Sequence, residues 1–494
     1  MKPIVVNMTE PSIRHDSSQQ PPVSATATLF AVSTASFLMP FMFSGVGIAL
    51  PSIGREMGAT AAQIGLVETG YMMSVSMFLL LMGRFGDVYG RKRIFQWGIA
   101  LFTLMGAAIS QAWSIHVVVV LRFLQGIGGA MIAATGMAIV VSVFPQHQRG
   151  KALGINVACV YAGLSCGPFL GGTIVTAWGW RWLFALCLPL GGVVFILLRW
   201  KLRGEWAGAV GEQIDWRGAA LFSISMILLV VGAAQLQKAA GAWQTMVAGM
   251  LLMAGFIWFE ARTSFPLLDV RLMRSNRLFT LSSLAALLNY AATFGVTFFM
   301  SLFLQYVKGF TPQQAGTLLV LQPVTQALFS PICGRLSDRY PAAWIATIGM
   351  GSCAAGLALS VGIDASTSIH AIAGVLLLLG IGFALFSSPN MSVIMGSVPP
   401  KHVGVASGLV AIMRTLGMMA SMTIVTVLFS TILHGQPITN ETQGGFIRCM
   451  QTGYFIYSLL CVVGVGISFG RLGGGRRPER GREGVDREEE GKAD

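Results

Sequence analysis

Long apolar segments alternate with short polar ones along most of the chain. We count fourteen apolar segments of about the length that a helix needs to cross a bilayer, which is roughly 20 residues. Backbone polar groups must be satisfied within such a segment, so each is predicted to be an α-helix. The first six are predicted at 29–50, 62–82, 94–112, 117–141, 153–177 and 182–198, two more at 218–236 and 245–259, and the last six at 278–303, 315–333, 344–361, 371–395, 404–429 and 454–469.

The polar interruptions divide these segments into groups. The stretch 199–217 is the longest polar interruption before the middle of the chain, and a charged connection at 260–277 precedes the last six segments. The end of the chain is Gly-rich, charged and almost free of large apolar residues, so it cannot bury a core. We predict a cytoplasmic N-terminal segment at 1–28, a six-helix bundle at 29–200, a linker with two inserted helices at 201–277, a second six-helix bundle at 278–470 and a disordered cytoplasmic tail at 471–494.

Composition narrows the class of protein further. Of the 494 residues, 54% are hydrophobic and 11% are charged, and the mean hydropathy is +0.69. Soluble domains carry about 25% charged residues. The chain is therefore predicted to be a multi-pass membrane protein, in the cell membrane.

The formal net charge of +13 raises the question of a nucleic-acid partner. Most of the 33 Lys and Arg residues fall on one side of the predicted topology, the side that holds both termini. This asymmetry is the positive-inside rule, so the basic charge indicates topology, with both termini cytoplasmic, and no nucleic acid is expected. The exceptions are five residues in predicted outer loops (Arg55, Arg181, Lys238, Lys308 and Arg448) and two inside spans (Arg122 and Arg414).

Two charged turns interrupt the apolar pattern at equivalent places. "GRFGDVYGRKRIF" occupies 83–95 and "GRLSDRY" occupies 334–340, each between the second and third span of a group of six. Transporters are often built from such repeats, with the substrate site at their interface near the middle of the membrane. The spacing predicts six helices plus six, with two helices inserted between them.

Four motifs in order resemble those of the major facilitator superfamily. The stretch 83–95 resembles its cytoplasmic signature, Gly-x-Leu-x-Asp-x-x-Gly-Arg-Lys, with Phe85 in place of Leu. "RFLQGIGGA" at 122–130 and "GLSCGPFLGG" at 163–172 resemble the motifs of its fourth and fifth spans. "WRWLF" at 180–184 is similar to the fourteen-span drug/proton antiporter subfamily. The resemblance covers about residues 29–470 and implies an all-α fold of 14 transmembrane helices (6+2+6), with two pseudo-symmetric six-helix bundles around a central cavity.

The first charged turn is a candidate conformational latch. Gly83 and Gly90 allow helices and a tight loop to approach closely. The basic residues, including Arg91, are also what a topology-setting loop contains, but Asp87 does little for topology. In the superfamily this Asp is thought to contact the start of a helix in the other half. The resemblance therefore places Asp87 near Gly404, where helix-terminal N–H groups stabilise a carboxylate.

The second turn is a weaker copy of the first. Gly334, Asp338 and Arg339 repeat part of the pattern, but Pro341 interrupts the basic run. The resemblance places Asp338 near Leu153, at the start of the fifth span.

The fifth-span motif is predicted to let its helix bend. Small residues at four-residue spacing allow membrane helices to pack closely, and proline removes a backbone hydrogen bond. The alternative is an ordinary tight helix contact. The residues concerned are Gly163, Gly167, Pro168, Gly171 and Gly172.

Few ionisable residues lie inside the predicted spans. Glu68 and Arg122 lie at similar depths from the outer ends of their spans, so an ion pair between them is geometrically possible. Met42 stands where the subfamily usually has a first-span Asp that binds a proton. Three hypotheses follow: Glu68 couples protons beside Arg122, coupling occurs elsewhere or not at all, or Glu68 extends to the lipid–water boundary.

Other polar residues inside spans are candidates for a substrate cavity. Interhelical hydrogen bonding is the alternative for each, and for Arg414 a structural role bonding backbone carbonyls is equally consistent. These candidates are Gln125, Asn156, Asn289, Gln322, Asn390 and Arg414.

The sequence predicts a secondary active transporter and not an enzyme. No Walker-type phosphate loop occurs, and the seven cysteines show no CxxC spacing, so we expect no cofactor and no metal, with a proton gradient as the energy source. The favoured function is proton-coupled export of a lipophilic or cationic small molecule by alternating access, with a monomer favoured. A lipid or glycolipid flippase, an uncoupled facilitator and a non-transporting membrane sensor or scaffold stay open as alternatives.

Overall fold

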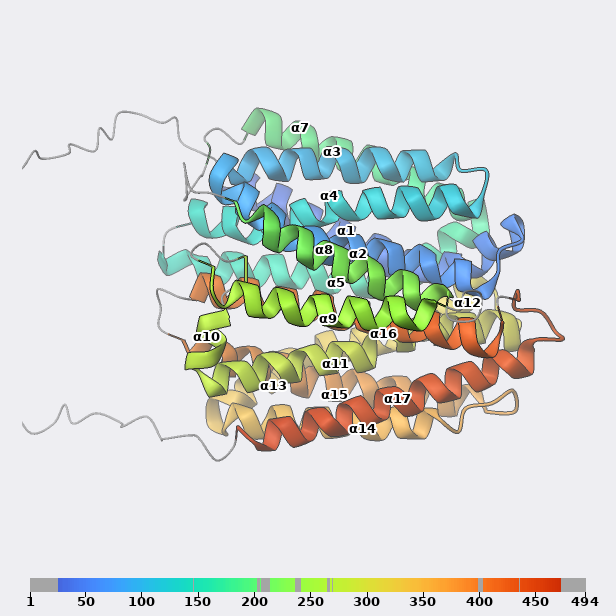
Figure 1. Cartoon of the computed structure of the whole chain (residues 1–494). Helices are drawn as coiled ribbons and strands as arrows, with labels where there is room; N and C mark the ends of the chain where they lie inside the picture. Colours follow the sequence, from blue (N-terminus) through green and yellow to red (C-terminus); the bar gives the residue numbers. More distant parts are fainter. Residues whose placement is uncertain are drawn as a thin grey trace, which may run out of the picture.

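The computed structural model describes residues 25–471 except 145, 202–204, 206–213, 236–240, 264–266, 269, 399–402 and 435. The described part of the chain is helical, and its helices run side by side along one axis (Figure 1). Fourteen of its segments are long and apolar enough to cross a membrane, which confirms the predicted all-α, multi-pass fold.

The first six spans are formed by seven helices. The sixth span is divided into α6 and α7 at Leu186, whose backbone stays right-handed helical, so the two cross as one segment. The helices are α1 (Ala25–Met57), α2 (Ala61–Tyr89), α3 (Arg91–Ser110), α4 (Ile115–Val143), α5 (Gln146–Trp178), α6 (Trp180–Ala185) and α7 (Cys187–Lys201).

The last six spans are preceded by two inserted helices. The inserted spans are α8 (Trp216–Gln235) and α9 (Ala242–Glu260), followed by the short α10 (Val270–Ser275). The last six contain α11 (Arg277–Leu302) with the π-helical turn η1 (Phe303–Val307), α12 (Pro312–Leu319), α13 (Leu321–Arg339), α14 (Ala342–Ser360), α15 (Ile369–Gly396), α16 (Val403–Ile432) and α17 (Gln443–Phe469).

The two groups of six repeat the same packing. In the first group α1 packs on α5, α4 packs on both α2 and α3, and α3 packs on α7. In the second group α11 packs on α16, α15 packs on both α13 and α14, and α14 packs on α17. These pairs correspond span by span, so the internal repeat predicted from the two charged turns is present in the fold.

In the view of Figure 1, α9 runs along the boundary between the two groups and α8 crosses in front of the first group. The helix α8 packs against α9, and it also contacts α2 of the first group and α16 of the second. Phe222 and Met226 of α8 and Phe256 of α9 belong to an apolar cluster that includes Leu409 of α16. The insertion therefore covers one line of contact between the two halves.

An even number of spans places the first and last described residues on one side of the membrane. We call this side the near side and the other the far side. At the far side Ser301 Oγ donates to Gly47 O (2.8 Å), Gln305 Nε2 to Ile48 O (3.1 Å) and Tyr306 Oη to Pro51 O (3.3 Å). These bonds join α1 to α11 and η1, so the two halves are closed against each other at the far side.

Most of the predicted tail lies outside the described residues, as does nearly all of the predicted N-terminal segment. Arg471 is the exception, because we assigned it to a disordered tail and the structure buries it with 3% of its surface exposed. The prediction was wrong for this residue, since its side chain turns back into the second half and donates to Ser282 and Asn390.

Candidate functional site

Glu68 of α2 and Arg122 of α4 form an ion pair inside the first half. Arg122 Nη2 lies 3.2 Å from Glu68 Oε1, and Arg122 and Glu68 are 0% and 2% exposed. Each lies seven residues from the far end of its helix, which at 1.5 Å per residue is about 10 Å. The equal depth inferred from the sequence is therefore realised as a direct contact, and Glu68 does not extend to the membrane boundary.

Neighbouring side chains hold the guanidinium of Arg122. Arg122 Nη1 donates to Gln125 Oε1 (3.0 Å), and Gln125 Nε2 donates to Phe102 O (3.3 Å) on α3. The guanidinium carbon lies 4.4 Å from the centre of the Tyr71 ring, a cation–π contact. Arg122 is thus fixed from α2, α3 and α4.

Two polar atoms of the Glu68–Arg122 pair lack hydrogen bonds among the described residues. Glu68 Oε2 and Arg122 Nε are buried and have no hydrogen-bond partner among the described residues. A buried charge is costly unless it is paired and hydrogen-bonded, so this carboxylate is held chiefly by Arg122. The vacant Oε2 can accept a proton without first breaking another hydrogen bond.

The residues beside Glu68 contact the second half. Thr69 Oγ1 lies 3.1 Å from Thr426 Oγ1 and 3.4 Å from Met422 O, both on α16. Thr69 directly follows Glu68 in α2, so the same helical turn carries the ion pair on one face and a contact between halves on the other.

An aromatic chain makes a second connection. The Tyr71 ring stacks on Phe43 of α1 at 6.3 Å, and Phe43 stacks on Phe294 of α11 at 4.7 Å. The rings of Tyr71 and Phe43 therefore link Arg122 to Phe294 in the second half. Met42, which replaces the usual first-span Asp, is buried in the apolar core with 1% of its surface exposed.

Two carboxylates, those of Asp87 and Glu205, accept hydrogen bonds in the first charged turn. Asp87 Oδ1 accepts from Arg91 Nε (3.0 Å) and Nη2 (2.8 Å), and Arg91 Nη1 donates to Ser142 of α4. Glu205, from the linker after α7, accepts from the backbone N–H of Lys92 (2.8 Å) at the start of α3. A helix N-terminus favours a carboxylate, and here Glu205 occupies that place.

Gly90 makes this contact sterically possible. Its φ is +107°, a left-handed conformation that favours glycine. A Cβ at Gly90 would also lie 2.4 Å from the Glu205 carboxyl carbon. Gly83, in contrast, has only ordinary room, because the nearest atom to its Cβ position is Ala134 Cβ at 3.9 Å.

The latch stays a prediction. The side chain of Asp338 and the surroundings of Gly404 and Leu153 lie outside what the structure describes. In the second turn Arg339 is exposed, and a Cβ on Gly334 would lie 3.3 Å from Ser388 Oγ.

The fifth-span glycines form a close contact surface for α1. Added Cβ atoms would lie 2.4 Å from Phe37 O at Gly163, 1.9 Å from Ser44 Oγ at Gly167 and 2.9 Å from Gly45 Cα at Gly171. This is the packing that small residues at four-residue spacing allow.

Two other residues of the motif, Pro168 and Gly172, lie close to α12 of the second half. A Cβ at Gly172 would lie 2.4 Å from Pro312 O, and one at Gly316 would lie 1.9 Å from Pro168 O. The α5 helix continues through Pro168 as one element, so the bending role stays a prediction.

The cavity candidates lie in several places. Gln125 belongs to the ion-pair cluster, Asn289 Nδ2 lies 3.8 Å from Met350 Sδ on α14, and Asn390 donates to Ser282 O on α11. Asn156 is buried against Met137, while Gln322 and Arg414 are partly exposed. The contacts of Gln125, Asn156, Asn289 and Asn390 match interhelical hydrogen bonding.

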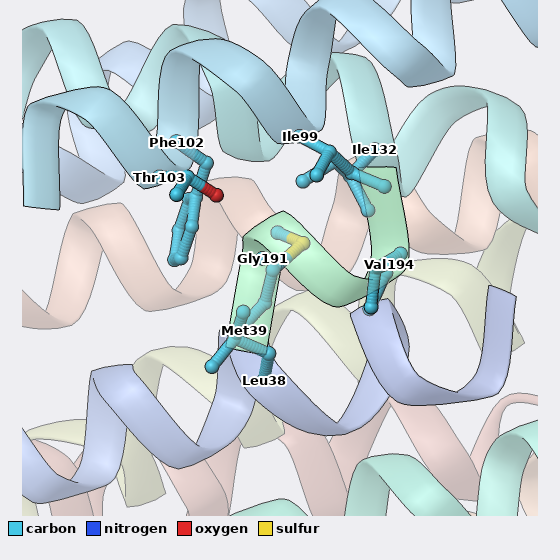
Figure 2. Close-up of a pocket in the computed structure, with 9 residues that line it drawn as sticks. Leu38, Met39, Ile99, Phe102, Thr103, Ile132, Gly191 and Val194 are labelled. Carbon is cyan, nitrogen blue, oxygen red and sulfur yellow. The ribbon is translucent and has the colours of Figure 1, made fainter. Parts of the chain in front are cut away.

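Two hollows in the described residues lie in or beside the first half. One, of about 10 Å³, lies between α1, α3, α4 and α7 and is shown in Figure 2 with Thr103 at its wall. It has room for one water at most. The other, of about 360 Å³, is lined by α2, α4 and α8, with Gln235 as the polar residue of an otherwise apolar wall. Neither hollow is lined by described residues of α11–α17.

Several contacts in the site were not predicted from the sequence. Tyr71 lies three positions after Glu68, so helical spacing could have placed it beside the pair. Glu205, the Phe43–Phe294 stack and the Thr69–Thr426 contact join segments far apart in the chain, and no local pattern signals them.

Two pseudo-symmetric six-helix halves that contact each other at the far side are an arrangement typical of membrane transporters. The family model described as Major Facilitator Superfamily matches residues 32–422 and, in a second match, 282–485. The chain therefore belongs to the major facilitator superfamily, as the motifs indicated. It is a transporter and not an enzyme.

Relatives with curated names include exporters. The chain is 30% identical over 399 residues to multidrug resistance protein Stp of Mycobacterium tuberculosis, covering 79% of this chain and 73% of that protein. It is 28% identical over 388 residues to the tetracenomycin C resistance and export protein of Streptomyces glaucescens, covering 77% and 72%. It is 26% identical over 438 residues to the riboflavin transporter RibZ of Clostridioides difficile, covering 88% and 95%.

Solved structures share the fold. A bacterial homologue of the human lysosomal transporter Spinster, inward-facing and unoccupied, matches with a TM-score of 0.67 at 14% identity, covering 93% of this chain and 100% of that chain. A mutant of the nucleoside transporter NupG matches with a TM-score of 0.60 at 13% identity, covering 90% and 99%.

Proposed function

We propose that this transporter exports lipophilic or cationic small molecules by alternating access in exchange for protons, with Glu68 as the proton-binding group. The observation that carries the proposal is the buried Glu68–Arg122 pair with its vacant Oε2. An ionisable group within a membrane span is costly and usually serves transport, and Met42 stands where the family resemblance led us to expect a carboxylate.

Protonation of Glu68 would act through Arg122. A proton on the carboxylate removes the charge that holds the guanidinium, which then keeps Gln125 and the rings of Tyr71 and Phe184. Arg122 and Tyr71 would shift together, and the Tyr71–Phe43–Phe294 chain would carry that shift to α11. Thr69 would carry the movement of α2 to α16. Proton binding would thus bias the far-side closure, which is the two-state element that coupled transport needs.

The substrate class is supported by the surfaces where the halves meet and by the relatives. Phe43 and Phe294 form an apolar contact between the halves, which suits lipophilic molecules. Relatives named as multidrug resistance and export proteins support outward transport. A relative named as a riboflavin transporter is a reason to include a flavin among the compounds tested.

Inverted membrane vesicles test this proposal. An acid-inside proton gradient is followed with a pH-sensitive dye while lipophilic cations, neutral drugs and a flavin are added in turn. Glu56→Gln is the matched control for Glu68→Gln, because Glu56 also pairs with an arginine, Arg181, but lies half-exposed at the end of α1.

We expect some compound to discharge the gradient in wild type and in Glu56→Gln, and not in Glu68→Gln. If an active compound discharges the proton gradient equally in wild type and in Glu68→Gln, Glu68 is not the coupling residue. No discharge by any compound in wild type would contradict coupled export and favour the uncoupled or lipid-flipping alternatives.

A further inference from the structure

A second buried arginine, Arg471, lies at the near side of the second half. It follows α17, and its side chain reaches between α11 and α15 with 3% of the residue exposed. Nη1 donates to Asn390 Oδ1 (2.5 Å) and to Ser282 Oγ (3.2 Å). Asn390 Nδ2 donates to Ser282 O (3.2 Å), which fixes the amide with its oxygen toward the guanidinium.

The charge of Arg471 is not balanced by the residues that hold it. Its two described partners are neutral oxygens, whereas Arg122 in the first half has a carboxylate. Burial lowers the pKa of Arg471 to about 10, so the guanidinium is still protonated at neutral pH. A buried cation without a counter-charge is strongly disfavoured, and an anion would relieve that cost.

The unused atoms lie on one edge of the guanidinium. Nε and Nη2 are buried and have no hydrogen-bond partner among the described residues. These two N–H groups point the same way and form the planar fork that takes two oxygens of a phosphate or carboxylate. These two unpaired N–H groups are the part of arginine that is best suited to an oxyanion.

The site lies close to the near-side ends of α11 and α17. Arg471 is two residues past the end of α17 at Phe469, and Ser282 is five residues into α11, about 8 Å from its near end. Basic pockets between helices at this level are suited to phosphate headgroups.

We propose that the Nε–Nη2 edge of Arg471 binds a phosphate oxyanion, supplied either by the headgroup of a membrane phospholipid or by free phosphate. The proposal concerns α11, α15 and α17 and does not depend on proton coupling through Glu68.

The test measures the midpoint of thermal unfolding of the purified full-length protein in a neutral detergent. One arm adds phosphatidylglycerol, with diacylglycerol of the same acyl chains as the control that lacks phosphate. The other arm adds sodium phosphate, with sodium chloride at equal ionic strength as the control. A ligand that binds only the folded state raises this midpoint.

Three variants make the test specific. Asn390→Asp places a carboxylate where Oδ1 now accepts from Arg471, so it supplies an internal counter-charge and should fold even if Arg471→Gln does not. Arg277→Gln removes an exposed arginine from the near end of α11 and controls for general electrostatic attraction.

We expect a rise of several degrees in wild type and in Arg277→Gln that is largely lost in Asn390→Asp and Arg471→Gln. A rise with phosphatidylglycerol alone identifies the lipid as the source, and an equal rise with sodium phosphate identifies the free anion. No rise in wild type in either arm, or an undiminished rise in Asn390→Asp, would overturn the proposal.

Discussion

The interaction free energy between Glu68 and Arg122 can be measured by a double-mutant cycle. Arg122→Met removes the partner at 3.2 Å from a carboxylate that is 2% exposed and whose other oxygen has no described partner. Glu68→Gln leaves the guanidinium with Gln125 and the rings of Tyr71 and Phe184. Removing one member of a buried ion pair costs about 3–5 kcal/mol, because the other charge stays buried without compensation.

We therefore expect each single change to lower the free energy of unfolding by about 3–5 kcal/mol. The double variant Glu68→Gln/Arg122→Met removes both charges and should lose less than either single variant, since replacing a whole buried pair is often close to neutral. The assay is equilibrium unfolding of the purified protein in mixed micelles with increasing SDS. If both single changes cost under about 1 kcal/mol and their effects simply add, the reasoning about the buried pair is refuted.

Two further variants test the motifs. Asp87→Asn removes a partly exposed pair with Arg91 that is worth only about 0.2–1 kcal/mol, so membrane abundance should hold while the transport rate per molecule falls in vesicles; an unchanged rate would argue against a latch. Gly167→Val places carbon 1.9 Å from the present position of Ser44 Oγ, and such overpacking costs about 1–3 kcal/mol or more. Its unfolding midpoint should fall while that of Gly192→Val, where no atom lies within 4 Å, is unchanged; equal midpoints would contradict the tight α1–α5 contact.

The fold was predictable because its signals are local. An apolar run of bilayer length can only be satisfied as a helix, so all fourteen spans were found, including 371–395, which corresponds to α15 (Ile369–Gly396). Boundaries were less exact. The helix α17 begins at Gln443, eleven residues before the predicted start at 454, because its first turns are polar and precede the apolar segment.

The site was only partly predictable. The equal depth of Glu68 and Arg122 in their spans made an ion pair between them possible. Depth alone does not reveal which faces of the two helices contact each other. The role of Glu205 at the start of α3 depends on a contact with Lys92, 113 residues earlier in the chain, which no local pattern signals. Arg471 was misassigned because the composition of the tail indicates disorder, whereas its burial depends on contacts with Ser282 of α11 and Asn390 of α15 that composition does not reveal.

The central claim is that Glu68 binds the proton that drives export. Wild type and Glu68→Gln are reconstituted into liposomes, and two rates are measured with one labelled substrate: accumulation driven by a proton gradient, and exchange with unlabelled substrate at equal pH. The account predicts that Glu68→Gln loses gradient-driven accumulation and keeps exchange, because exchange needs the two halves to rock but needs no proton to be released. Gradient-driven accumulation at the wild-type rate in Glu68→Gln would contradict it.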